Sequence, residues 1–185
     1  MTRNPERRAA LLDAAIEVLA GDGARGLTFR AVDQRAGTPV GTASNYFASR
    51  EDLLMGVCRR ITAHVLPEAA DLVVHERTTD QVVEFVRGIV RRVSANRTGH
   101  LAMLELRLEA TRRPELMADL TAALRAQFEA NVAFHVDAGL PGGRDGVVVL
   151  QLAVTGLLLE HLTLPGVLGD HDLDALITTI VGRVT

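Results

Sequence analysis

Apolar residues recur at helical spacing along almost the whole chain. Leu12, Ala15, Ile16 and Leu19 are three or four residues apart, which places them on one stripe of an amphipathic helix. No stretch shows the alternation of apolar and polar residues that is typical of a half-buried strand. The pattern therefore predicts an all-α fold of about nine helices.

The start and stop signals of helices are clear near the N-terminus. Asn4 as N-cap and Pro5 at the first helical position predict the start of the first helix, and the glycines of residues 21–23 predict its end. A short second helix is predicted from about Thr28, which can cap it, to Ala36. The Gly that follows at position 37 fits a left-handed C-terminal residue.

Two further helices follow directly. Thr38 is a candidate cap for a third helix over residues 39–47, in which Pro39 takes the first helical position. The run Ser49-Arg50-Glu51-Asp52 resembles a capping box and predicts a long fourth helix from about residue 50 to Leu66. Pro67 is expected to bend or end it.

The rest of the chain reads as five more helical segments separated by turns rich in proline and glycine. Their apolar stripes lie within residues 82–93, 101–108, 116–132, 147–162 and 173–184.

The second and third predicted helices form the pattern of a helix-turn-helix motif. Such a motif joins two short helices by a tight turn, and its second helix enters the major groove of DNA. Small residues stand where the two helices meet, among them Ala31, Ala36, Gly41 and Ala43. A helical hairpin in the core of a bundle fits the same local pattern, so both interpretations stay open at this point.

The predicted second helix of the motif carries side chains that fit base edges and phosphates. These are Val40, Thr42, Ser44, Asn45 and Tyr46, flanked by Arg30 and Arg50.

Residues from about 8 to 60 resemble the DNA-binding domain of the TetR family of bacterial transcriptional regulators. The segments that carry the resemblance, in order, are residues 27–32, 35–37, 41–43 and 46–54. The resemblance implies a homodimeric regulator, most often a repressor, which binds a palindromic double-stranded DNA operator and is released by a small-molecule effector. It implies a DNA-binding domain over residues 1–50, joined by the long helix to a ligand-binding and dimerisation domain over residues 51–185.

The resemblance also implies roles for individual residues. The recognition helix is expected to begin at Pro39, with phosphate contacts from Thr38, Thr42 and Tyr46. Val40, Ser44 and Asn45 are expected nearer the bases. Arg30 matches a position that reaches a base in some members. Arg50 replaces the family's usual lysine at the start of the fourth helix, where a phosphate contact is expected.

Three positions depart from the family's usual pattern. Ser44 stands where most members have tyrosine, Asp33 where alanine is common, and Val40 where a polar or basic residue often lies.

A dimer surface is expected on the last two helices, because one helix-turn-helix unit reads only a few base pairs. The segment 147–162 is apolar nearly all round, which also fits a central core helix of a monomer. The predicted dimer residues are Val148, Leu152, Leu159, Leu162, Leu173, Leu176, Ile177, Ile180 and Val184.

A ligand pocket is expected among the helices between about residues 61 and 162, where polar residues stand beside apolar stripes. The candidates are His64, Met103, Glu105, Arg107, Glu109, Gln127, Asn131 and His161. Glu105 and Glu109 also fit ion pairs with Arg107, Arg112 and Arg113. With one Tyr, no Trp and five Phe, the chain offers little aromatic surface, which favours an aliphatic or a small acidic or neutral effector.

Composition excludes several other classes of protein. Of 185 residues, 48% are hydrophobic and 23% charged, so the chain is not expected to be disordered. The single Cys58 cannot form an internal disulfide and is expected to be buried, although a redox-sensing thiol is an alternative. The apolar stretch 147–159 is interrupted and shorter than the roughly 20 residues of a membrane span, which favours a cytoplasmic protein that does not contact the membrane.

The sequence shows no pattern of an enzyme or a metal site. The six histidines include no i, i+4 pair, and no nucleophile and base stand at a recognisable spacing, so neither a metal, a cofactor nor catalysis is expected. The alternative to a regulator is a helical small-molecule-binding or adaptor protein without specific DNA recognition.

Overall fold

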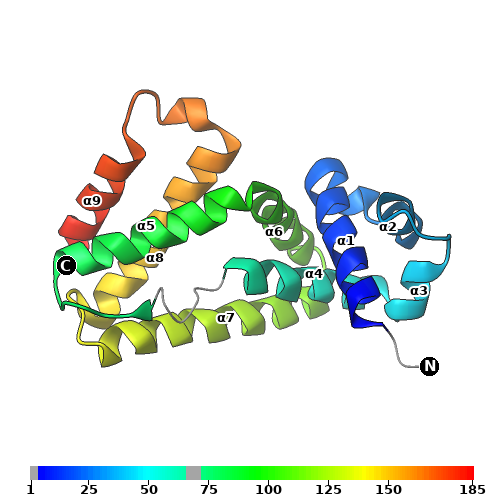
Figure 1. The fold of residues 1–185 in the computed structure, drawn as a ribbon, viewed down its shortest axis with the longest axis horizontal. Helices are drawn as coiled ribbons and strands as arrows, with labels where there is room; N and C mark the ends of the chain where they lie inside the picture. Colours follow the sequence, from blue (N-terminus) through cyan, green and yellow to red (C-terminus); the bar gives the residue numbers. More distant parts are fainter. Residues whose placement is uncertain (1–3, 66–71) are drawn as a thin grey trace. The chain divides into compact units, whose positions relative to one another are not determined.

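The computed structural model describes residues 4–65 and 72–185, and within these ranges the chain is helical without strands (Figure 1). The predicted all-α fold is confirmed. The helices are α1 (Pro5–Gly26), α2 (Phe29–Arg35), α3 (Thr42–Tyr46), α4 (Arg50–Val65), α5 (Thr79–Ala95), α6 (Arg97–Ala110), α7 (Pro114–Asp137), α8 (Gly143–Thr163) and α9 (Leu173–Val184), with a short 3-10 helix at Pro165–Val167. The predicted bend at Leu66 and Pro67 lies outside the described residues.

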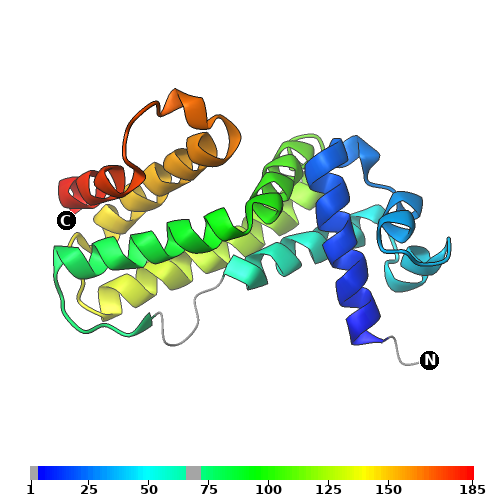
Figure 2. The same ribbon diagram turned by 45° about the horizontal axis from the view of Figure 1, so that its top comes forward.

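The helices group into two compact units. Unit 1 comprises Met1–Val65 and Asn96–Ala123, and unit 2 comprises Leu66–Ala95 and Leu124–Thr185. In unit 1, α1 packs against α2, α4 and α6, and Figure 2 shows α6 beside α1. The sequence did not predict that α6 lies with the N-terminal helices.

The core of unit 1 is made mostly of aliphatic side chains from several helices. Leu19 of α1, Leu53 of α4 and Leu106 of α6 are fully buried, together with Phe47, which follows α3. Cys58 is also fully buried, as predicted, and burial raises the pKa of its thiol.

Capping residues set the ends of α1 and α4. The side chain of Asn4 accepts hydrogen bonds from the N–H groups of Glu6 and Arg7, which confirms the predicted N-cap. The Ser49 hydroxyl accepts a hydrogen bond from the N–H of Asp52 at 3.1 Å, which confirms the predicted cap of α4.

The predicted end of α1 at residues 21–23 is only partly right. Gly23 does leave the helical conformation, with a φ of 68°. The helix continues over residues 24–26, and the N–H of Ala24 donates to the Glu105 carboxylate.

Unit 2 is built around α5, α8 and α9. Its buried core includes Val82 and Val86 of α5, Val154 and Leu157 of α8, and Val181 of α9. An ion pair between Arg87 and Asp174 also links α5 to α9. These contacts hold one face of α8 in the core of unit 2.

α8 is longer than the apolar stretch predicted from the sequence. It has 21 residues and, within the described ranges, is the one helix long and apolar enough to cross a membrane by length and composition. The expectation that it falls short of a span was therefore wrong. The sequence argument missed that the helix extends beyond residues 147–159 at both ends.

Candidate nucleic-acid interface

α2 and α3 form the predicted helix-turn-helix arrangement. The Thr28 hydroxyl accepts a hydrogen bond from the N–H of Ala31 at 3.1 Å and caps α2, as predicted. Gly37 follows α2 with a φ of 62°, a conformation that favours glycine. The two helices, which are neighbours in the sequence, pack against one another.

The third helix begins later than predicted. α3 starts at Thr42, after Gly41, which has a φ of 95°. Thr38 is therefore not its cap, and Pro39 is not its first residue. Residues 38–41 instead form a turn, in which the Thr42 N–H donates to the carbonyl of Pro39 at 3.1 Å. α3 is thus only five residues long, too short to be stable without tertiary contacts.

Asp33 supplies the cap that α3 lacks. Gly41 has no side chain to act as a cap, and the carboxylate of Asp33 in α2 accepts the N–H groups of Gly41 and Ala43, each at 2.7 Å. Its main-chain carbonyl accepts the N–H of Thr38 at 2.9 Å. Asp33 is fully buried. The sequence showed it only as a departure from the family pattern and gave no sign of this role.

The predicted base-contacting side chains lie at the surface of the motif. Val40 is 77% exposed, and Ser44 and Asn45 are exposed as well. Among the other predicted DNA contacts, Arg30 and Pro39 are exposed, whereas Thr38, Thr42 and Tyr46 are half-buried. The motif therefore presents polar, basic and apolar groups to solvent.

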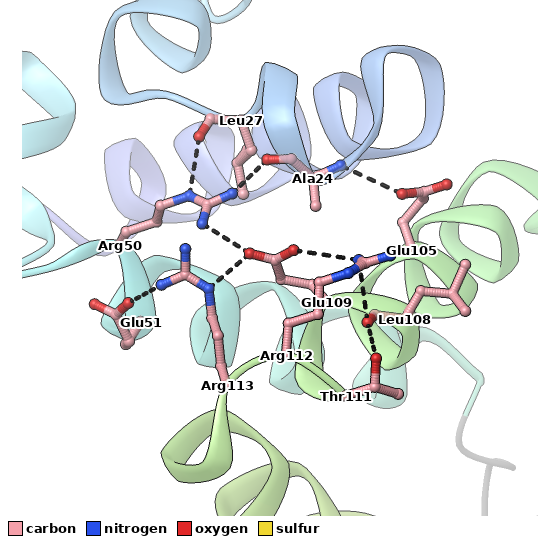
Figure 3. A network of polar contacts seen from close by, with 10 residues as sticks. All are labelled: Ala24, Leu27, Arg50, Glu51, Glu105, Leu108, Glu109, Thr111, Arg112 and Arg113. Atoms are coloured by element: carbon pink, nitrogen blue, oxygen red, sulfur yellow. Dashed lines mark hydrogen bonds and ion pairs between the residues drawn. The ribbon is translucent and has the colours of Figure 1, made fainter.

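Arg50 points into unit 1 (Figure 3). Its guanidinium donates to the carbonyls of Leu27, at 3.3 Å, and Ala24, and to the Glu109 carboxylate at 3.0 Å. These three hydrogen bonds engage three of the five N–H donors of the guanidinium. The geometry shows that Arg50 links α4 to the end of α1 and to α6, and its phosphate contact stays a prediction.

Glu109 is the centre of a charged network that joins α4 to α6. One oxygen of Glu109 accepts from both Arg50 and the Nε of Arg113, the latter at 2.6 Å. Arg113 also pairs with Glu51 at 2.6 Å, and Arg112 lies 3.8 Å from the second oxygen of Glu109. The hydrogen bond from Arg113 is the main cause that lowers the pKa of Glu109, and Arg50 adds to it, while burial opposes both. The predicted ion pairs of Glu109 with Arg112 and Arg113 are confirmed.

Glu105, one turn earlier on α6, holds the end of α1. Its carboxylate accepts the N–H of Ala24 at 3.3 Å. Arg50 donates to the carbonyl of Ala24, so both the main-chain N–H and the main-chain carbonyl of Ala24 are bound by side chains of other helices (Figure 3). Glu105 and Glu109, which were predicted to line a pocket, thus both serve contacts within unit 1. Glu105 was also predicted to form an ion pair, but its hydrogen-bond partner here is a main-chain N–H.

Comparison with known proteins identifies the relatives of this chain. The model of "Bacterial regulatory proteins, tetR family" matches residues 11–57, and the "Tetracyclin repressor-like, C-terminal domain" matches residues 77–185, which is more than half of the chain. The chain belongs to the TetR family. The resemblance predicted from the helix-turn-helix segments is confirmed, and the family's members are transcriptional regulators.

Individual relatives cover most of this TetR-family chain. The HTH-type transcriptional regulator BetI of Rhizobium meliloti (strain 1021) is 27% identical over 159 residues, which cover 80% of this chain and 78% of BetI. A TetR-family structure from Streptomyces coelicolor A3 superposes with a TM-score of 0.74 at 25% identity, covering 98% of this chain and 99% of the other. The multidrug binding protein EbrR, complexed with imidazole, gives a TM-score of 0.68 at 25% identity and covers 98% and 97%.

The remaining pocket candidates of this TetR-family chain divide between the two units. His64 and Arg107 are exposed and Met103 is half-buried, all in unit 1. In unit 2, Asn131 is exposed, and Gln127 and His161 are half-buried. Their role in a pocket stays a prediction.

The predicted dimer residues fall into two groups. Leu152 and Leu159 of α8 are exposed and Val148 is half-buried, whereas Leu162 and Ile177 are buried in the core of unit 2. Burial in the protomer contradicts a dimer role for Leu162 and Ile177. The other four residues are half-buried and pack against the same core: Leu173, Leu176, Ile180 and Val184.

The sequence missed two positions on the exposed face of α8. Val149 is exposed, and the open space around Gly156 holds no atom within 4 Å of where a Cβ would lie. With Leu152 and Leu159 they form a stripe at intervals of three and four residues.

Proposed function

We propose that this TetR-family protein is a homodimeric repressor that binds a palindromic operator through α2 and α3 and is released by a small molecule. The observation that supports DNA reading best is the Asp33-capped helix-turn-helix motif, which holds Val40, Ser44 and Asn45 at the surface. The second helix of such a motif reads base edges with its N-terminal residues. The protein acts on DNA in the bacterial cytoplasm.

Homodimerisation follows from the site that the motif reads and from the surface of α8. Two-fold operators place their half-sites about 34–36 Å apart, or a multiple of this, and so call for a two-fold protein. The stripe of Val149, Leu152, Gly156 and Leu159 is apolar and exposed in the protomer. We assign it to the dimer interface, where the missing side chain at Gly156 lets a second helix approach closely.

Release by an effector follows from linkage between two binding sites. A small molecule that favours a conformation with misplaced recognition helices weakens the binding of DNA. By linkage, DNA weakens the binding of the small molecule by the same factor. EbrR, a structural relative, was seen with imidazole, ethidium and proflavin, which supports a small-molecule site in this chain. The scarcity of aromatic residues favours an aliphatic or a small acidic or neutral effector here.

Selection of genomic DNA fragments by the purified protein at two salt concentrations tests this function. A repressor recovers a palindromic sequence held with a Kd of about 10⁻⁸ M or tighter at physiological salt. An adaptor without DNA recognition recovers only weakly bound fragments that share no sequence and are released by salt. The variant Asn45→Ala, which leaves the charge unchanged and removes one exposed polar side chain from the motif, is expected to change the sequence that is recovered.

A further inference from the structure

Val40 is an exposed apolar side chain within the helix-turn-helix motif. At 77% exposed it is the most exposed large hydrophobic residue in the described part of the chain. It lies in the turn between α2 and α3, directly before Gly41, the N-cap residue of α3. Its neighbours on the motif, Ser44 and Asn45, are polar.

Asp33 holds the turn that carries Val40 on both sides. Before Val40, the N–H of Thr38 donates to the main-chain carbonyl of Asp33 at 2.9 Å, and the Thr38 hydroxyl donates to the same carbonyl at 3.3 Å. After Val40, the N–H of Gly41 donates to the carboxylate of Asp33 at 2.7 Å. Pro39, with its fixed φ, limits the turn further. The position of Val40 is therefore set before any partner binds.

The chemistry of the major groove offers one apolar feature to such a side chain. Of the four bases, only thymine presents a methyl group there, at C5, while the remaining edges are hydrogen-bond donors and acceptors. Valine has two methyl groups and cannot form hydrogen bonds through its side chain. A fixed, exposed valine beside a recognition helix thus fits a T·A pair better than any other.

We propose that Val40 reads a thymine in each operator half-site by packing on its 5-methyl group, and that Asp33 is the positioning residue that presents Val40. The proposal rests on the proposed DNA-binding function and names one base of the operator. Asp33 does not itself contact DNA, because it is fully buried and its carboxylate is engaged by the N–H groups of Gly41 and Ala43.

Replacement of thymine by deoxyuridine, which lacks only the 5-methyl group, tests the contact without changing the protein. Each thymine of the selected operator is replaced in turn, and the Kd of the wild-type protein is measured by fluorescence anisotropy. We expect one position in each half-site to weaken binding by about fourfold, which corresponds to about 0.8 kcal/mol for one buried methyl group. At that position Val40→Ala lowers affinity for the thymine operator and removes the difference between thymine and deoxyuridine.

Leu108→Ala is the matched control for Val40→Ala. Leu108 is also a large, exposed apolar residue of unit 1, but it lies on α6. This variant is expected to keep the full preference for thymine over deoxyuridine. A tight wild-type operator complex that tolerates deoxyuridine at every position, or a Val40→Ala variant that keeps the preference, overturns the proposal. Failure to select any operator instead overturns the proposed function.

The role of Asp33 is tested with Asp33→Asn, which keeps the shape of the side chain and one acceptor oxygen but loses the second acceptor. We expect it to lose the preference for thymine at the Val40 position and to keep the weak, salt-dependent affinity for unrelated DNA that depends on charge. Circular dichroism establishes whether the Asp33→Asn variant is folded. The deoxyuridine scan uses the wild-type protein and therefore does not depend on the folding of the variant. If folded Asp33→Asn retains the preference for thymine, Asp33 does not position Val40.

Discussion

Replacing Glu109 by glutamine is expected to destabilise the protein markedly. The wild-type carboxylate accepts two charge-assisted hydrogen bonds on one oxygen, from Arg50 at 3.0 Å and Arg113 at 2.6 Å. Such bonds contribute about 1.5–3 kcal/mol each when enclosed. The side chains of Arg50 and Arg113 are 28% and 37% exposed, so solvent screens part of this energy, and the amide oxygen of glutamine remains a weaker acceptor. A loss of about 2 kcal/mol in the free energy of unfolding follows.

The loss has a predicted pH dependence. The arginines lower the pKa of Glu109 in the folded protein below its ordinary value of 4.5. A carboxyl group with a lowered folded pKa contributes stability above its ordinary pKa and loses that contribution as the pH falls through the folded value. Glutamine does not titrate. The difference in stability between the wild-type protein and Glu109→Gln is therefore largest near pH 7 and shrinks as the pH falls below about 4.5.

Urea unfolding followed by far-UV circular dichroism measures both quantities at a series of pH values. Glu129→Gln is the matched control, because the pair of Glu129 with Arg144, at 3.0 Å, has side chains that are 42% and 59% exposed. Such a surface pair contributes about 0.5 kcal/mol or less. The reasoning is refuted if both variants lose the same stability at pH 7, or if the deficit of Glu109→Gln stays constant down to about pH 3.

Four further outcomes are expected. Gly23→Ala lowers the free energy of unfolding by about 1 kcal/mol or more in urea, because the φ of 68° disfavours a side chain and the added Cβ would lie 3.2 Å from the Glu105 carboxylate. Leu152→Glu yields monomers in sedimentation velocity without loss of helicity, because this side chain is 69% exposed in the protomer; a dimer that persists excludes the α8 stripe as the interface. Arg50→Ala lowers thermal stability and leaves the slope of DNA affinity against salt concentration unchanged, because its guanidinium binds protein acceptors; a slope reduced by about one unit would instead establish the predicted phosphate contact. Cys58 reacts with a thiol reagent only in denaturant, because it is buried and burial raises the pKa of its thiol; rapid reaction of the folded protein favours the redox-sensing alternative.

Sequence rules predicted the features of the fold that depend on neighbours in the chain. The caps at Asn4, Thr28 and Ser49 and the left-handed Gly37 are all confirmed, because each acts within a few residues. The predicted start of α3 was wrong, and the reason is also local in the chain. Pro39 favours a helix start, but Gly41 adopts a φ of 95°, which delays the helix to Thr42.

Contacts between distant parts of the chain were beyond the sequence pattern. Arg50 and Glu109 are separated by 59 residues, and nothing local distinguishes an arginine that faces solvent from one that reaches α6. The same holds for α8 and α9, whose residues are apolar on several sides. Periodicity could not separate Ile177, which is buried in unit 2, from Leu152, which is exposed.

The capping of α3 by a residue of α2 has a consequence for how this motif can acquire new targets. Stability rests on Asp33, Ala43 and Phe47, all of which are buried, while Val40 and Asn45 face solvent. The outward residues are therefore free to vary at little cost to folding. A library randomised at Val40, Ser44 and Asn45 should contain mostly folded proteins, so that altered DNA preference can be selected directly in a single round of mutation.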